Sequence, residues 1–368
     1  MKNKFALNDK VSASVRKMSP YTPGEQPGES GWVKLNTNEL PYAPSPKVRE
    51  AVISAMGPDG EMLRLYPDPY SRELRKAVAE YYGMEAEYAF AANGSDDALN
   101  LAVRAFSDES LKIATIDPSY SLYPVLAKIQ GAEIIQIPFA GDLEIPFEKI
   151  FSSGANIFFF TNPNAPTGKG FGLNAVAEIC ENFGGIVLVD EAYAPFARET
   201  AIPLVKKYEN LIVTGTSSKG WGLAGMRIGW AFAQPAIIEI FDRVRDSYNL
   251  DRLAQAAGVA ALRDAPYHLE CVGKVIAERS ATEKFFDSIG WKYIKSSSNF
   301  ILFEPFRDGK KASVSEASSL FEYLRSKKIL LRYFPKDKNV NKSIRLTVGT
   351  PGQMEAFRAA AIEWKKGE

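Results

Sequence analysis

Short apolar runs, separated by polar and helix-like segments, constrain the fold of this chain most strongly. The runs are Ile113–Ile116, Ile134–Ile137, Ile157–Phe160, Ile186–Val189, Leu211–Val213 and Met226–Phe232. Helix-like apolar spacing precedes them at Pro44–Ala55 and Ser71–Tyr82. Runs without polar alternation are typical of strands that are buried on both faces. The pattern therefore predicts an α/β fold with a mostly parallel sheet sandwiched by helices.

The pattern changes after about Asp251. A long helical stretch, Leu253–Phe286, precedes strand-like runs at Tyr293–Ile294, Asn299–Phe303 and Ser343–Val348, which predicts a smaller α+β domain. The chain has 368 residues and so exceeds the size at which a single core keeps growing. We expect an N-terminal arm, residues 1–45, that belongs to the small domain, a large domain, 46–250, and a C-terminal small domain, 251–368.

Reactive and charged groups follow two of the apolar runs. Asp190 ends one run, and Lys219 follows the next in Thr216-Ser217-Ser218-Lys219, with Arg227 shortly after. In parallel sheets such groups gather at the carboxyl ends of the strands. An amine that can form a Schiff base, an acid that can keep a ring nitrogen protonated and donors for a phosphate are the parts needed to use pyridoxal phosphate.

Each residue alone has a commoner explanation. A lysine after two serines is usually solvated, an aspartate at a strand end usually forms a turn or a helix cap, and an arginine usually makes a weak surface ion pair. Their joint occurrence, in this order, favours the cofactor site. Gly94-Ser95-Asp96-Asp97 adds the start of a predicted helix, whose free backbone N–H groups can face an anion.

Several motifs resemble known signatures. Asn162-Pro163-Asn164-Ala165-Pro166-Thr167-Gly168, Asp190-Glu191-Ala192-Tyr193, Ser218-Lys219 and Arg227 resemble the series found in fold-type I pyridoxal-phosphate aminotransferases. Leu35–Glu39, Leu65–Asp68, Asn93–Ala98 and Ile344–Thr350 sharpen the resemblance to the histidinol-phosphate aminotransferase family. The resemblance runs from about Val15 to the C-terminus. Ala165 departs from it, because a second asparagine is more usual there, and so does the Asn93–Asp97 loop.

The resemblance implies a role for each matching residue. Lys219 would carry the cofactor and move a proton, Asp190 would face the ring nitrogen, and Tyr193 would hold the ring oxygen. The implied cofactor-binding residues are Lys219, Asp190, Tyr193, Asn162, Tyr120, Ser95, Asp96, Thr216, Ser218, Arg227 and, from a partner subunit, Tyr66. The implied substrate-binding residues are Arg345, Arg332, Tyr21 and Asn162. Arg345 would meet the carboxylate of glutamate in one half-reaction and the substrate phosphate in the other.

The function implied by the resemblance is a transamination dependent on pyridoxal 5′-phosphate. It would interconvert histidinol phosphate and 2-oxoglutarate with imidazole-acetol phosphate and glutamate, in histidine biosynthesis, within a homodimer. Transamination of aromatic amino acids and decarboxylation of a phosphorylated amino acid are alternatives on the same fold. A ligand-binding protein without catalysis is an alternative of a different class.

Composition excludes several other classes of function. A net charge of +1 and a pI near 7.6 give no reason to expect nucleic acid as a partner. The two cysteines, Cys180 and Cys271, lack the spacing of a disulfide framework or metal site, and the single histidine, His268, excludes a multi-histidine metal site. We expect His268 at the surface, because its helix-like stretch is polar. The lack of a transmembrane-length apolar run or a signal-peptide core predicts a cytoplasmic protein without a membrane partner.

Overall fold

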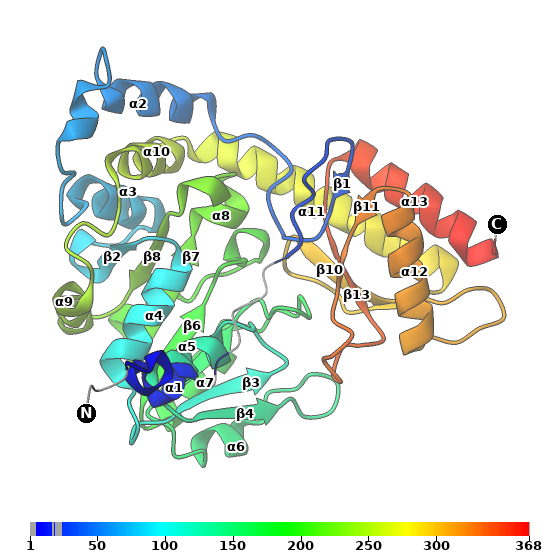
Figure 1. Ribbon diagram of the computed structural model, residues 1–368, viewed down its shortest axis with the longest axis horizontal. Coiled ribbons are helices and arrows are strands. Elements are labelled where there is room, and N and C mark those ends of the chain that lie inside the picture. Colours follow the sequence, from blue (N-terminus) through cyan, green and yellow to red (C-terminus); the bar gives the residue numbers. More distant parts are fainter. Residues whose placement is uncertain (1–4, 17, 19–23, 368) are drawn as a thin grey trace.

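The computed structural model describes residues 5–16, 18 and 24–367 (Figure 1). The strands are β1 (Val33–Lys34), β2 (Ala89–Ala92), β3 (Ile113–Asp117), β4 (Ile134–Pro138), β5 (Ile157–Thr161), β6 (Ile186–Asp190), β7 (Leu211–Thr216), β8 (Gly229–Phe232), β9 (Lys292–Tyr293), β10 (Phe300–Glu304), β11 (Ile329–Leu330), β12 (Arg332–Tyr333) and β13 (Ile344–Thr347).

The α-helices are α1 (Ala13–Arg16), α2 (Pro46–Met56), α3 (Arg72–Tyr82), α4 (Ser95–Phe106), α5 (Tyr123–Gln130), α6 (Phe147–Phe151), α7 (Leu173–Asn182), α8 (Ser217–Gly220), α9 (Pro235–Val244), α10 (Arg252–Leu262), α11 (Ala265–Ile289), α12 (Val314–Ser326) and α13 (Pro351–Lys366). Short 3-10 helices are η1 (Leu7–Lys10), η2 (Glu61–Arg64), η3 (Ala86–Tyr88), η4 (Ala194–Phe196), η5 (Ile202–Lys206) and η6 (Ala224–Met226).

A seven-stranded sheet in the order β2-β8-β7-β6-β5-β3-β4 forms the centre of the large domain. β4, β3, β5, β6 and β7 pair in parallel, and β8 alone runs against its neighbours. Parallel neighbours need crossover connections, which the helices between the strands supply. The carboxyl ends of β5, β6 and β7 therefore meet at one edge of the sheet.

Both faces of this sheet are covered, which explains the unbroken apolar runs (Figure 1). Along β5, Phe158 and Phe160 pack into a core with α3, α7 and α10, whereas Phe159 packs on the other face with α4, α5 and α9. Side chains along a strand alternate between the faces, so a strand that is buried on both sides must be apolar at every position. The predicted α/β fold with a mostly parallel sheet and helices on both faces is confirmed.

The small domain is built on a four-stranded antiparallel sheet, β12-β13-β10-β9, which packs with α12 and α13 around Phe286 from α11. The N-terminal strand β1 pairs in parallel with β11, with Val33 opposite Ile329, and Leu35 enters the same core. Residues 33–35 of the expected arm thus lie in the small domain.

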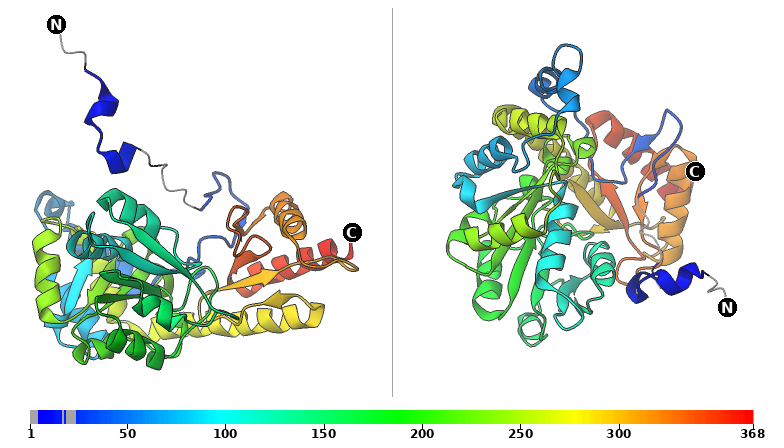
Figure 2. Two further views of the ribbon diagram at one scale, coloured as in Figure 1. Left: turned by 90° about the horizontal axis from the view of Figure 1, so that it is seen from below. Right: turned by 60° about the vertical axis from the view of Figure 1, so that its left-hand side comes forward.

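Helix α11 extends from the large domain to the small domain (Figures 1 and 2). The single helical stretch expected from Leu253 to Phe286 is wrong: α10 ends at Leu262, and α11 begins at Ala265 with a proline in its first turn. Proline is tolerated there because a first-turn N–H has no partner within the helix. Buried residues of α10 belong to the large core, so we propose that the domain boundary lies within α11 rather than at 250/251.

The stability of the large domain should depend on its phenylalanine-rich strand β5. Phe158 is fully buried, and its replacement by alanine should lower the free energy of unfolding by about 3–5 kcal/mol, since a cavity remains. Ile129→Ala is the control, because Ile129 is 50% exposed and a surface change costs about 0.5 kcal/mol or less. Urea unfolding followed by circular dichroism measures both; equal losses would contradict the assigned core.

Candidate functional site

The predicted reactive groups meet at the edge formed by the carboxyl ends of the parallel strands. Asn162 directly follows β5, Asp190 ends β6, and Lys219 lies in α8, directly after β7. Thr161 and Asp190 are paired across β5 and β6, and Asp190 and Thr214 across β6 and β7. Strand pairing therefore brings together groups that lie far apart in the sequence.

Asp190 is a buried carboxylate that is held by three donors. The Tyr123 hydroxyl donates to Oδ2 at 2.8 Å, and the Ala192 amide and the Thr214 hydroxyl lie 3.2 and 3.5 Å from Oδ1. Burial raises the pKa of Asp190 to about 6, although these hydrogen bonds favour the charged form. A protonated nitrogen beside it would stabilise the carboxylate charge. Tyr123 was missed in the sequence, where it is one aromatic of a helix.

The amine of Lys219 has a lowered pKa. Burial, followed by the nearby positive charge of Arg345, lowers the pKa of its amine to about 8, while Glu39 and Asp96 oppose the shift. The amine Nζ donates to the carbonyl oxygen of Thr37 at 3.2 Å. About a tenth of such amines are neutral at pH 7, so Lys219 can act as a nucleophile and a base.

An anion cradle lies between the start of α4 and the turn after β7. A Cβ on Gly229 would lie 2.4 Å from the Ser95 backbone nitrogen, and one on Gly94 would lie 2.7 Å from Nη2 of Arg227. These glycines let the backbone and the guanidinium approach one another. Arg227 adopts a left-handed conformation, with φ of 53°, and its Nη2 lies 3.4 Å from Oδ2 of Asp96.

The hydroxyls of the turn complete the cradle. Thr216 Oγ1 caps α8 by accepting from the Ser218 backbone N–H at 3.1 Å, and it lies 3.0 Å from Ser218 Oγ. Backbone N–H groups at a helix start, two hydroxyls and a guanidinium form a set of donors suited to a phosphate. The structure brings the predicted residues Ser95, Asp96, Thr216, Ser218 and Arg227 together.

Two tyrosines flank this space. The Tyr120 hydroxyl donates to Oδ1 of Asp96 at 3.2 Å, and the Tyr193 hydroxyl accepts from Nδ2 of Asn38 at 2.9 Å. Asn38 is itself fixed by the Thr347 hydroxyl at 3.0 Å. This support for Tyr193 was not predicted from the sequence, because Asn38 lies 155 residues away from it. Both amide ends of Asn162 bind the backbone of Phe171, at 2.9 Å each, and its amide nitrogen carries a second N–H for a ligand.

Two arginines of the small domain stand directly opposite each other. Arg332 of β12 pairs in register with Arg345 of β13. Both guanidinium groups lie near the ring of Phe334, at 5.3 and 5.5 Å from its centroid. Two neighbouring guanidinium groups offer several N–H donors that are suited to an anion. Nη2 of Arg345 also donates to the Asn36 carbonyl at 3.1 Å.

One predicted residue, Tyr66, lies at the surface. Tyr66 is 76% exposed and stacks on Tyr248, with ring centroids 4.3 Å apart. Tyr21 lies outside the residues that the structure describes. The expectation of a surface position for His268 is wrong, because the side chain is buried against Trp221. His268 belongs to α11, which contacts α8, the short helix that contains Lys219.

No group of three or more histidine, cysteine, aspartate or glutamate side chains among residues 5–16, 18 and 24–367 could hold a metal ion. Each helix within those ranges is too short or too polar to cross a membrane.

Comparison with known proteins places the chain in a family. The family model for aminotransferase class I and II matches residues 30–360. Histidinol-phosphate aminotransferase of Geotalea daltonii is 42% identical over 357 residues, which cover 96% of this chain and 99% of that protein. The protein of the same name from Microcystis aeruginosa is 40% identical over 353 residues, which cover 95% of this chain and 97% of that protein.

A solved structure agrees. The histidinol-phosphate aminotransferase of Sinorhizobium meliloti, in complex with pyridoxal 5′-phosphate, superposes with a TM-score of 0.80 at 26% identity, covering 90% of each chain. Pyridoxal 5′-phosphate carries an aldehyde, a ring nitrogen and a phosphate, which suit the amine of Lys219, the carboxylate of Asp190 and the anion cradle. The chain therefore belongs to the class I and II aminotransferases and is a transaminase of fold-type I that depends on pyridoxal 5′-phosphate.

Proposed function

We propose that the chain transfers an amino group from histidinol phosphate to 2-oxoglutarate, giving imidazole-acetol phosphate and glutamate, as a step of histidine biosynthesis. The names of the relatives support this substrate. The single observation that carries it is the paired arginines, Arg332 and Arg345, directly opposite each other on β12 and β13. A phosphate can use both guanidinium groups, whereas an α-carboxylate can be held by Arg345 alone.

The site fits the cofactor residue by residue. Backbone N–H groups at the start of α4, with Thr216, Ser218 and Arg227, would bind the phosphate. The backbone and Arg227 approach Gly94 and Gly229 so closely that neither position has room for a Cβ. Asp190 would lie against the ring nitrogen, and Tyr120 would stack on the ring.

The remaining polar groups would orient the ring. Tyr193, held by Asn38, would donate its hydroxyl proton to the ring oxygen, and the second N–H of Asn162 would join it. When bound, pyridoxal 5′-phosphate supplies an aldehyde that reacts with amines and a ring that stabilises negative charge at the substrate Cα.

The chain's own residues then handle the protons. The raised pKa of Asp190 reflects a charge that burial leaves poorly solvated, so a shared proton on a ring nitrogen would relieve it. Lys219 Nζ, as a neutral amine, would take the proton from the substrate Cα and deliver it to the cofactor carbon. Arg345 would bind the carboxylate of glutamate in one half-reaction and, with Arg332, the phosphate of histidinol phosphate in the other.

A homodimer would complete the site. Exposed apolar side chains lie on α2, between α2 and α3 and on the segment that follows α9, where Tyr248 stacks on Tyr66; they are Ile53, Leu63, Leu65, Tyr66, Tyr70 and Tyr248. Such a patch is typical of a protein interface. Tyr66 would reach the cofactor phosphate of the partner subunit. We also propose a cytoplasmic location, since Cys180 and Cys271 are buried free thiols that suit a reducing compartment.

The proposed reaction can be tested by titrating the cofactor-loaded protein with histidinol phosphate. The visible absorption of the lysine-bound cofactor should disappear at micromolar substrate and return with 2-oxoglutarate. Lys219→Ala should show neither change, and borohydride should no longer attach the cofactor to the chain. Lys274→Ala, a change at an exposed ion pair with Glu270, is the control. A response to aromatic amino acids but not to histidinol phosphate would refute the substrate.

Arg332 should distinguish the two substrates. Arg332→Ala should raise KM for histidinol phosphate about 10- to 100-fold, because a charge-assisted hydrogen bond to the phosphate is lost. KM for glutamate should change much less, since Arg345 would bind its α-carboxylate. Steady-state kinetics with each substrate measures this, with Arg325→Ala as a surface control. Equal increases for both substrates would assign Arg332 a structural role.

Subunit mixing tests the assignment of Tyr66. Tyr66→Ala and Lys219→Ala should each lower activity, but a mixed dimer would contain one site with both residues intact. Equal mixing should therefore recover about a quarter of wild-type activity if subunits exchange randomly. Sedimentation measures the oligomeric state of each sample. An active monomer, or a mixed dimer without recovered activity, would contradict the proposal.

A further inference from the structure

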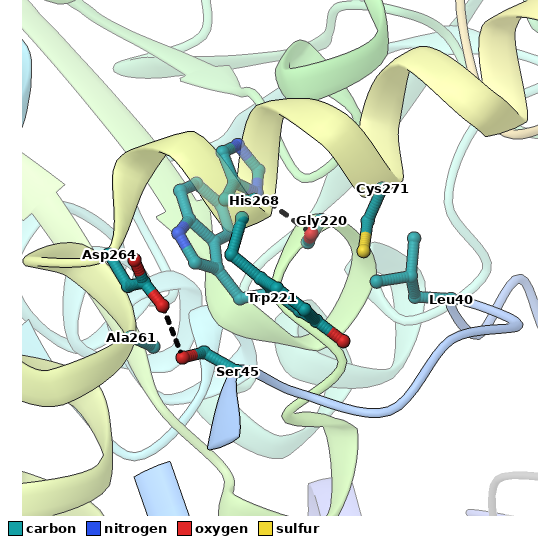
Figure 3. Close-up of a pocket in the computed structure, with 9 residues that line it drawn as sticks. Leu40, Ser45, Gly220, Trp221, Ala261, Asp264, His268 and Cys271 are labelled. Atoms are coloured by element: carbon teal, nitrogen blue, oxygen red, sulfur yellow. Dashed lines mark hydrogen bonds between the residues drawn. The ribbon is translucent and has the colours of Figure 1, made fainter. Parts of the chain in front are cut away.

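The two residues that follow Lys219 are both held by one side chain of α11. Nδ1 of His268 lies 2.8 Å from the carbonyl oxygen of Gly220, and the imidazole stacks on Trp221 with ring centroids 4.0 Å apart and an interplanar angle of 4° (Figure 3). His268 is only 3% exposed. A single imidazole therefore fixes both a peptide carbonyl and an aromatic ring next to the reactive lysine.

The hydrogen bond determines the form of the imidazole. A carbonyl oxygen can only accept, so Nδ1 of His268 must carry a proton. Burial lowers the pKa of His268 to about 4, although the bond to Gly220 opposes the shift. The ring is therefore neutral near pH 7 and donates through Nδ1. It does not change its charge near neutral pH.

The turn has little room to move. A Cβ on Gly220 would lie 2.9 Å from Cε1 of His268 and 2.9 Å from Cβ of Pro195 in η4. On the other side, the Ser217 hydroxyl donates to the Ile228 carbonyl at 3.2 Å. The short helix α8 is thus held at Ser217 by Ile228, the residue before β8. At Gly220 it is held by His268 of α11 and by Pro195 of η4.

The space beside the imidazole is also small. A cavity of about 10 Å³ adjoins it (Figure 3). It is lined by Leu40, Ser45, Gly220, Trp221, Ala261, Asp264, Tyr267, His268 and Cys271. Such a volume holds about one water-sized sphere. The imidazole therefore has little free space beside it on this side.

We propose that His268 is a positioning residue for Lys219: its Nδ1–H and its ring hold Gly220 and Trp221, so that the amine of Lys219 stays aimed at the reacting atoms. This inference rests on the proposed role of Lys219. The physical reason is that proton transfer depends steeply on geometry, and a displacement of about 1 Å can cost about 100-fold in rate.

Two substitutions separate the hydrogen bond from the packing. His268→Phe keeps an aromatic ring for Trp221 but removes the donor, whereas His268→Asn can place an amide N–H near the former Nδ1. We expect His268→Phe to lower kcat about 10- to 100-fold with KM for glutamate changed by less than about threefold. His268→Asn should recover most of kcat. Cys271→Ala, which alters the same cavity wall on the same helix, is the matched control.

A second readout uses the cofactor-free protein. The pH dependence of Lys219 acylation, followed by mass spectrometry, gives the pKa of its amine. In His268→Phe this pKa should rise by about one unit, because a looser turn admits water to the buried amine. His268→Asn and Cys271→Ala should keep the wild-type value. A substitution that affected folding alone would not shift this pKa in the folded fraction.

The single histidine of the chain provides a test without any substitution. Nitrogen-15 NMR of histidine-labelled protein should show one neutral imidazole protonated at Nδ1, with no titration between about pH 5.5 and 8. Protonation at Nε2, or a pKa near the ordinary value, would overturn the inference. This measurement can overturn the inference even if His268→Phe does not fold.

The outcomes also separate this inference from the proposed function. If borohydride fails to attach the cofactor to Lys219 in the wild-type protein, the proposed role of Lys219 is wrong and the positioning inference falls with it, whatever the NMR result. If attachment succeeds, but His268→Phe keeps the wild-type kcat and the wild-type pKa of Lys219, the positioning inference alone is wrong.

Discussion

Parallel pairing of β5, β6 and β7 is the constraint on which the rest of the structure depends. It places Asn162, Asp190 and Lys219 at one edge, because the strands point the same way and end together. The helices that make parallel pairing possible also bury both faces of the sheet. The reactive groups at this edge, such as Asp190, are therefore buried together with the sheet.

This burial acts on the acid and the amine in complementary ways. It raises the pKa of Asp190 and lowers that of Lys219, so both groups are driven toward their neutral forms. The acid is thereby suited to share a proton with a ligand nitrogen, and the amine to accept one near neutral pH. One physical cause thus prepares both groups for transamination before any substrate binds.

The sequence predicted the parts of the fold that burial makes visible. β3 to β7 were found because strands buried on both faces are apolar throughout, but β2 was missed because Ala89-Phe90-Ala91-Ala92 carries only one large apolar side chain. The candidate reactive residues were proposed from their motifs, and the structure brings Asn162, Asp190 and Lys219 to one edge of the sheet. Tyr123, Asn38 and His268 were not proposed in this way, because their partners Asp190, Tyr193 and Gly220 lie far away in the sequence. Such contacts exist only after the elements have packed, and no local spacing encodes them.

The N-terminal segment that precedes α2 connects the two halves of the site. The carbonyl of Asn36 accepts from Arg345, the next carbonyl, of Thr37, accepts from Lys219, and the side chain of Asn38 donates to Tyr193. Three consecutive residues of one segment thus contact Arg345, Lys219 and Tyr193, to which the proposed function assigns the substrate, the proton transfer and the cofactor ring.

Because peptide geometry fixes the spacing of neighbouring carbonyls, this segment restrains the separation of Arg345 and Lys219. His268 restrains the lysine from the opposite side, through α11, whose far end packs in the small domain around Phe286. The small domain therefore presents its arginines to the lysine through two routes, a hydrogen-bonded segment and a continuous helix. The proposed substrate carries its amino and phosphate groups on one small molecule and would require such a separation, so these residues would act on specificity without contacting substrate or cofactor.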